Sequence, residues 1–256
     1  MSKKIIRKVN NKKNRSVSEI GILGYGEVGQ AIAKFFKNPR IKDLTRDDDL
    51  VGIKILHITI SWSDKFIKIV ENEMRRLSPK LTIIHSTVAL GTTKKISTDT
   101  KMLVVHSPVR GIHPDLFKGI KTFVKYIGGE SKEAVKEAEK HYRKLGLKTK
   151  AYIPAATTEA LKLWDTTQYG WMIVLNKEMK KWCEEKKLDF DVVYTEANRS
   201  YNEGYIKLGR KEVVRPNLKY MAGEIGGHCV LNNCRILKSD IAKIILKKNE
   251  SYKSKE

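Results

Sequence analysis

Residues 20–36 read IGILGYGEVGQAIAKFF, a short apolar run that gives way to glycines and then resumes. The glycines stand at positions 24, 26 and 29, and the apolar residues after them follow the spacing of a helix. A strand, a tight turn and a helix with G-x-G-x-x-G spacing are typical of a dinucleotide-binding unit. The segment therefore predicts a cofactor-binding turn, whose residues are Gly24, Tyr25, Gly26, Glu27, Val28 and Gly29.

Each part of this turn has a physical task. Gly24 permits the turn, Gly26 lets a pyrophosphate approach the backbone, and Gly29 lets the helix pack against the strand. The start of the helix offers N–H groups and the positive end of its dipole to the phosphates. Asp43 follows Gly24 at roughly the 20-residue spacing of a ribose-binding carboxylate, which predicts NAD. Arg46 lies near enough to keep NADP, whose ribose carries a 2′-phosphate, as an alternative.

Composition narrows the class of protein. The chain has 256 residues, of which 41% are hydrophobic, and no apolar run approaches the ~20 residues of a membrane span. The N-terminus lacks a hydrophobic signal core, so we expect a cytoplasmic protein without a membrane partner. The three cysteines form neither an obvious disulfide framework nor a C-x-x-C knuckle, and we predict no metal site.

The formal net charge of +22 is the most unusual property of the composition. Much of it comes from lysines spread along helix faces or gathered near the two ends of the chain. A nucleic-acid partner is therefore the less favoured interpretation, although so positive a field attracts anionic ligands. We expect residues 1–17 to be a disordered basic tail and residues 248–256 to be a second tail.

Strands alternate with helices from residue 19 to residue 153. This alternation predicts an α/β fold with a Rossmann-type, doubly wound parallel sheet over residues 18–153. Ligands of such sheets lie at the carboxyl ends of the strands. Three predicted strand ends therefore join the site: Thr59, Ile60 and Ser61; Ser86 and Thr87; and Ser107 and Pro108.

The pattern changes after Pro154. Residues 157–186 read as one long helix, and residues 190–204 and 235–248 also have helical patterns. We predict that residues 154–247 form a smaller all-helical domain for substrate binding and dimerisation. The active site is expected between the two domains.

Several motifs lie in a fixed order along the chain. Besides the glycine turn they are STVALGTT at 86–93, HSP at 106–108 with IGG at 127–129, Glu159-x-x-Lys162, and GEIGGHCV at 223–230. Together they resemble the nucleotide-sugar dehydrogenases, the family of UDP-glucose and UDP-N-acetylmannosamine dehydrogenases. That family lies within the wider 6-phosphogluconate and hydroxyacid dehydrogenase group. The resemblance covers roughly residues 19–240.

The resemblance implies an NAD-dependent oxidation in which a cysteine attacks the aldehyde made by a first hydride transfer. It assigns Cys229 as the nucleophile and Lys162 as the oxyanion stabiliser or acid–base group. It also implies a homodimer formed through the long helix. Gly227 suits a loop that approaches a ligand closely, and His228 can favour the thiolate of Cys229.

The chain departs from the family pattern in three places. Val109 stands where the family has a glutamate, Thr166 replaces its asparagine, and Asn232-Asn233 replace a Lys-Asp pair. The sequence also ends where the resemblance would place the family's C-terminal UDP-binding domain. These departures leave open the substrate, the number of electrons moved, and whether a separate subunit binds a nucleotide.

Other polar residues suggest a different substrate pocket. His106, Arg110 and His113 cluster after a strand end, where Arg110 can hold a carboxylate or phosphate and either histidine can act as acid or base. The sequence thus predicts an NAD(P)-dependent oxidoreductase for a small anionic or sugar-derived alcohol or aldehyde. Two alternatives stay open: a non-catalytic NAD-binding sensor or partner subunit, and a nucleic-acid-associated basic protein.

Overall fold

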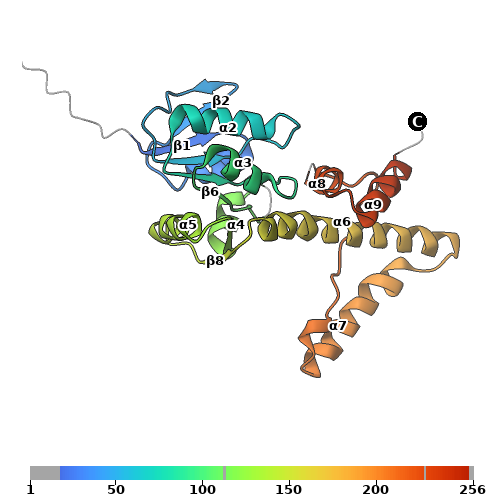
Figure 1. The fold of residues 1–256 in the computed structure, drawn as a ribbon. Coiled ribbons are helices and arrows are strands. Elements are labelled where there is room, and N and C mark those ends of the chain that lie inside the picture. The colour runs from blue at the N-terminus through green and yellow to red at the C-terminus, as the bar shows by residue number, and fades with distance from the viewer. Residues whose placement is uncertain (1–17, 112–113, 228, 254–256) are drawn as a thin grey trace, which may run out of the picture.

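One eight-stranded sheet, in the order β3-β2-β1-β4-β5-β6-β7-β8, forms the N-terminal part of the structure (Figure 1). The structure is a computed structural model that describes residues 18–111, 114–227 and 229–253. The strands are β1 (Ile20–Leu23), β2 (Arg40–Asp43), β3 (Arg46–Asp47), β4 (Ile55–Ile58), β5 (Leu81–Ile84), β6 (Val104–His106), β7 (Lys125–Gly129) and β8 (Thr149–Tyr152).

Helices follow most of these strands and cover both faces of the sheet. They are α1 (Glu27–Ala33), α2 (Phe66–Leu77), α3 (Thr92–Thr100), α4 (Leu116–Thr122) and α5 (Lys132–Lys144). One buried cluster includes Ile22, Ile83 and Tyr142, and the other includes Leu56, Phe66 and Met74. Strands buried on both faces explain why the sequence shows continuous apolar runs rather than alternation.

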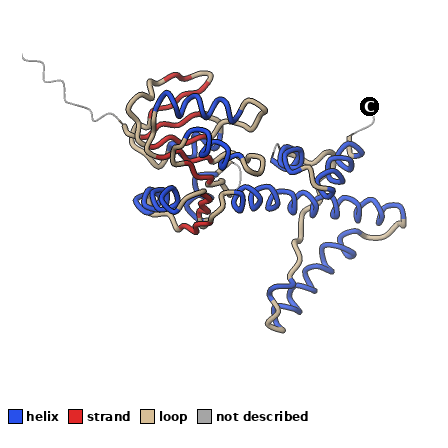
Figure 2. Tube along the Cα trace, viewed as in Figure 1, coloured by secondary structure: helices blue, strands red, loops and turns tan. Residues whose placement is uncertain are grey.

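The second part contains only helices and loops among its described residues, as Figure 2 shows. Its elements are α6 (Ala156–Glu185), a π-helical turn η1 (Asp191–Glu196), α7 (Ala197–Lys207), a 3-10 turn η2 (Lys211–Val213), α8 (Cys229–Leu237) and α9 (Asp240–Ser251). Helix α6 is the long axis of this part, with α8 and α9 on one side and α7 projecting on the other (Figure 1). The predicted fold class is confirmed.

The sheet is not parallel throughout, which corrects the sequence-based prediction. Strand β7 runs antiparallel to β6, and the short strand β3, which was not predicted, runs antiparallel to β2. The chain re-enters the sheet beside the end of β6. A hydrogen bond of 2.7 Å from Ser107 Oγ, just after β6, to Tyr126 O, near the start of β7, shows this position. Strand β7 therefore travels in the opposite direction to its neighbour.

The helix predicted over residues 235–248 is two helices. Helix α8 ends at Leu237, Lys238 adopts a left-handed φ of 55°, and Ser239 caps α9 by accepting from Ala242 N over 3.2 Å. The predicted tail over 248–256 starts inside α9. Residues 1–17 and 254–256 lie outside the described residues. None of the helices in the described ranges combines the length and apolar character that crossing a membrane requires.

Candidate active site

The glycine turn joins β1 to α1 as the sequence predicted, and packing explains two of its glycines. A Cβ on Gly29 would lie 2.3 Å from Gly24 O, and a Cβ on Gly24 would lie 2.8 Å from Ile60 N. A Cβ on Gly26 would meet no heavy atom within 4 Å. The chain's own packing thus leaves open space at Gly26, where a ligand can approach the backbone.

Polar groups from three strand ends converge beside this turn. Asp43 ends β2, and its Oδ2 accepts a hydrogen bond of 2.6 Å from Tyr25 N. Thr59, just after β4, donates to Gly24 O over 2.7 Å. Ser86, after β5, donates to Ile60 O over 2.6 Å. The fold therefore gathers these predicted cofactor residues, although the two hydroxyls bond to backbone carbonyls.

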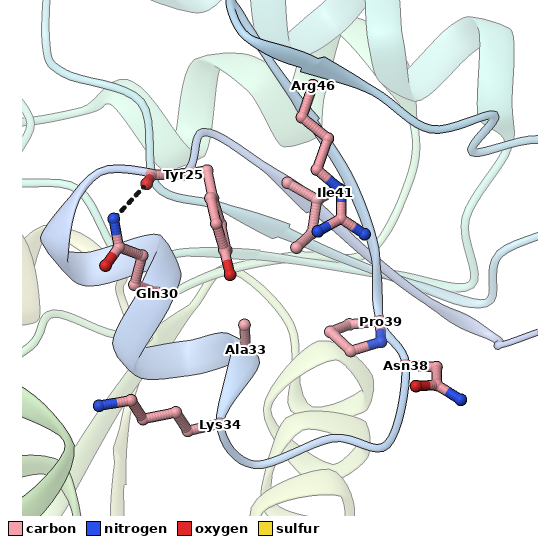
Figure 3. A pocket seen from close by; sticks show the side chains of 8 residues that line it. All are labelled: Tyr25, Gln30, Ala33, Lys34, Asn38, Pro39, Ile41 and Arg46. Carbon is pink, nitrogen blue, oxygen red and sulfur yellow. Dashed lines mark hydrogen bonds between the residues drawn. The ribbon is translucent and has the colours of Figure 1, made fainter.

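A cavity of about 360 Å³ lies against the turn (Figure 3). The Tyr25 ring points into it, with Arg46 from β3 on one side and Lys34, the residue after α1, on another. Sequence reasoning named Tyr25 and Arg46 but missed the rest of the lining, most of which comes from α1 and from the connection between α1 and β2, where no motif marks a site. Its residues are Tyr25, Gln30, Ala33, Lys34, Asn38, Pro39, Ile41 and Arg46.

His106 is fully buried, and both of its ring nitrogens have partners. Nε2 lies 3.1 Å from Ser86 O, which can only accept, so Nε2 carries the proton. Nδ1 then accepts from Thr158 Oγ1 at 2.9 Å. Burial lowers the pKa of His106 to about 3. The ring thus ties α6 to the sheet, and its catalytic role stays a prediction.

Helices α6 and α8 pack together, and Lys162 on α6 and Cys229 on α8 are close enough to interact electrostatically. Lys162 is partly buried on α6, and Cys229 is an exposed thiol at the first residue of α8. Burial lowers the pKa of Lys162; Asp165 and Cys229 oppose this shift, and the charge of Arg110 adds to it. The structure therefore brings the two residues that the resemblance singled out into one electrostatic environment.

Arg110 is held at the start of β7 by aromatic rings. Its guanidinium lies 4.6 Å from the Tyr126 ring centroid and 5.1 Å from that of Phe123, and Nη2 donates to Val124 O over 3.2 Å. This arrangement fixes a positive charge that acts on Lys162. An anionic group bound nearby would gain from both cations.

Lys125 is a site residue that sequence reasoning missed. Its ammonium group is buried and donates to Ser107 O over 2.6 Å and to Pro108 O over 2.8 Å. Burial lowers its pKa well below the usual range, with further contributions from Lys162 and Arg110. The sequence signal was a charged residue inside an otherwise apolar strand. Ser107 is itself buried, and Lys125 thus fixes the backbone of Ser107 and Pro108 against β7.

The other predicted site residues have varied surroundings. The Thr166 hydroxyl donates to Lys162 O in its own helix over 3.3 Å, so it does not stand in for a free amide. Gly227 has a left-handed φ of 77° and is exposed ahead of α8. His113 and His228 lie outside the described residues. Cys183 and Cys234 are buried, as expected of core thiols.

Sequence comparison gives a partial match. No family model matches the chain. UDP-N-acetyl-D-mannosamine dehydrogenase of Methanocaldococcus jannaschii is 30% identical over 155 residues, which cover 59% of this chain and 33% of that protein. The matched region thus spans about a third of the length of this relative.

Solved structures extend the likeness over nearly the whole chain. UDP-D-ManNAc dehydrogenase from Pyrococcus horikoshii superposes with a TM-score of 0.74 at 19% identity, covering 92% of this chain and 69% of that one. Mycobacterium tuberculosis 3-hydroxyisobutyrate dehydrogenase gives a TM-score of 0.64 at 11% identity, with 92% and 93% coverage. The resemblance to nucleotide-sugar dehydrogenases is confirmed, and the fold is shared with a hydroxyacid dehydrogenase.

Proposed function

We propose that the protein is an NAD-dependent oxidoreductase acting on a small anionic or sugar-derived alcohol or aldehyde. The observation that carries the proposal is the open space at Gly26 beside the Asp43 carboxylate. In the helical part, Lys162 on α6 and Cys229 on α8 are close enough to interact electrostatically. The likeness to dehydrogenases supports the same class of reaction.

The turn fits a dinucleotide by its donors and by its shape. The N–H groups at the start of α1 would bind the pyrophosphate next to Gly26. One Asp43 oxygen is held by Tyr25 N, which leaves the other to accept from a ribose hydroxyl. Arg46 is engaged by Asp48 at 2.8 Å, so a 2′-phosphate would have to compete for it. These contacts favour NAD over NADP.

The substrate end would work through two cations, Lys162 of the helical part and Arg110 of the sheet part. The nicotinamide, when bound, accepts or supplies the hydride. A lysine whose pKa is lowered can take the proton that an alcohol oxygen loses, and can return it to the oxyanion in the reverse direction. Arg110 would hold the anionic group of the substrate, and Cys229 would line the reacting carbon.

Binding and turnover of the nicotinamide test this proposal. We expect wild-type protein to bind NADH saturably and at least about tenfold more tightly than NADPH, measured by fluorescence at moderate salt. Gly26→Glu should fold normally, because the position is open, yet weaken NADH binding at least about 30-fold by filling the pyrophosphate space. Lys162→Met should keep NADH binding and lose turnover of whichever alcohol or aldehyde a substrate panel identifies.

The alternatives give other outcomes in the same experiment. NADH binding without turnover across the panel would favour a sensor or a partner subunit. A failure to bind either nucleotide would overturn the dehydrogenase proposal. Nucleic-acid binding that survives removal of both basic ends would then become the leading interpretation.

We also propose a homodimer through α6. Large apolar side chains remain exposed along this helix: Trp164, Tyr169, Leu175 and Trp182. Helix α7 packs mainly on the adjoining turns η1 and η2. Ile206 in α7 and Leu208 just after it add to the exposed apolar surface. Apolar surface of this extent typically marks a protein interface.

The dimer proposal predicts a change of mass on charging this surface. The double variant Leu175→Glu/Trp182→Glu should elute as a monomer in size-exclusion chromatography with light scattering, whereas wild type should be a dimer, because two carboxylates would be desolvated in the interface. Val51→Glu, an equally exposed apolar site outside α6, should leave the dimer intact. A monomeric wild type would contradict the proposal.

A further inference from the structure

The carboxylate of Glu159 is buried in the first turn of α6 and accepts three hydrogen bonds from another part of the chain. Its Oε2 accepts from Gly91 N over 2.7 Å, and its Oε1 accepts from Thr93 N over 2.8 Å and from Thr93 Oγ1 over 2.7 Å. Both oxygens therefore face hydrogen-bond donors. A side-chain amide, which presents an N–H₂ group, could satisfy only one side of this arrangement.

These bonds serve the start of α3. Its N-cap residue, Gly91, has a left-handed φ of 84° and offers no side chain to the first turn. The first N–H groups of a helix need acceptors, and a carboxylate placed there also interacts well with the helix dipole. Glu159 thus caps α3 from a separate helix and holds the loop over residues 86–93 against α6.

Two neighbouring contacts make the beginning of α6 a fixed joint. Thr158 bonds to His106 at the end of β6, and Ala155 N donates to Glu130 Oε1 over 3.1 Å after β7. Glu159 is the residue of α6 whose side chain bonds directly to the loop of residues 86–93. Lys162 lies about one turn beyond Glu159 on the same helix, where its place relative to that loop depends on the joint.

We propose that Glu159 is a positioning residue that fixes Lys162 relative to the cofactor loop of residues 86–93. This inference rests on the proposed function and deepens it. Both oxygens of Glu159 are bonded to Gly91 and Thr93, so it would act through the loop on one side and through α6 on the other. Loosening it should alter the surroundings of Lys162 as well as cofactor affinity.

The test compares Glu159→Gln with Glu133→Gln, the same substitution in the first turn of α5, where the side chain is exposed. The pH midpoint of Lys162 acetylation by acetic anhydride is read by peptide mass spectrometry, with exposed Lys136 as the internal reference. Burial lowers the pKa of Lys162 in the intact protein. In Glu159→Gln we expect this midpoint to rise by about one pH unit as Lys162 becomes hydrated.

Cofactor affinity provides the second readout. Glu159→Gln should bind NADH about tenfold more weakly, whereas Glu133→Gln should match wild type. Thr93→Val keeps the carboxylate and removes one donor, and it should shift both readouts in the same direction by a smaller amount. It also decides the matter if Glu159→Gln does not fold.

The inference and the proposed function fail differently. A wild type that does not bind NADH contradicts the proposed function, while the acetylation midpoint still tests the role of Glu159 without any cofactor. Folded Glu159→Gln protein with an unchanged Lys162 midpoint overturns the inference. If only Thr93→Val folds, an unchanged midpoint in that variant does the same.

Discussion

Acidification to about pH 5 is expected to destabilise this protein strongly, because its interior contains histidines that are neutral in the fold. His57 Nδ1 lies 2.9 Å from His85 Nε2, and the ring of His141 contacts that of His57 at 5.1 Å between centroids. His106 is buried nearby in the same sheet. Lys125, Lys144 and Lys162 add positive charges around this group.

Burial is the largest cause of the pKa shift in all four rings. It lowers the pKa of His57 and His85 well below the usual range, that of His106 to about 3 and that of His141 to about 4. Below pH ~6.5 the unfolded chain therefore binds more protons than the fold does. The contribution of these four histidines to the free energy of unfolding is fully present above that pH and falls as the pH falls.

The expected size of this effect is large. Each histidine lowers the free energy of unfolding by about 1.4 kcal/mol for every pH unit below its unfolded pKa, which amounts to about 2 kcal/mol at pH ~5. Four of them together approach the whole stability of a typical domain, which is about 5–15 kcal/mol. Urea unfolding followed by circular dichroism at several pH values would measure this slope.

His141→Phe tests the contribution of a single histidine to this pH dependence of stability. The ring of His141 already stacks on Phe36 at 5.7 Å, and its Nε2 has no hydrogen-bond partner among the described residues, so an aromatic replacement should be accepted. We expect stability near pH 8 to change by less than about 1 kcal/mol and stability near pH 5 to rise by about 2 kcal/mol. A variant with the wild-type pH slope would contradict this account.

Gly128→Ala is expected to destabilise the protein by disturbing the packing of α6 against β7. A Cβ at this position would lie 2.2 Å from Thr158 Oγ1 and 2.9 Å from the Cα of Ala155, so backbone as well as side chain would have to move. Overpacking of this kind costs about 1–3 kcal/mol, and the rigid joint places this site at the upper end. The free energy of unfolding in urea is the measurement.

Gly204→Ala is the matched control for Gly128→Ala. A Cβ at Gly204 would meet no heavy atom within 4 Å, and the residue lies inside α7. Alanine there should be neutral or stabilising by up to about 1 kcal/mol, since it has the better helix propensity. Equal stability of the two variants would show that α6 does not pack against β7 as described.

Local sequence patterns predicted the elements whose causes are local. The glycine turn, the apolar strands and the long helix follow from spacing within a few residues, and they were found with nearly correct bounds. The break at Lys238 was missed because its left-handed conformation belongs to a residue type with no preference for it. The direction of β7 was missed because it depends on where the chain re-enters the sheet.

Two residues near the candidate site have hydrogen-bond partners far away in sequence, which local patterns could not show. His106 bonds to Thr158 and to Ser86, and Glu159 bonds to Gly91 and Thr93. Within the sequence, His106 looked like an available acid or base and Glu159 like one letter of a motif. Only the packing of α6 on the sheet shows that both side chains form hydrogen bonds between the sheet and the helical part.

The 30-residue helix α6 is an unbroken rod about 45 Å long, fixed at one end. A rod held in this way acts as a lever. A tilt of about 5° at the joint would carry its far end, where Trp182 and η1 lie, through about 4 Å. Small changes in the orientation of α6 near Lys162 would therefore produce large displacements of α7 at the far end of the helix.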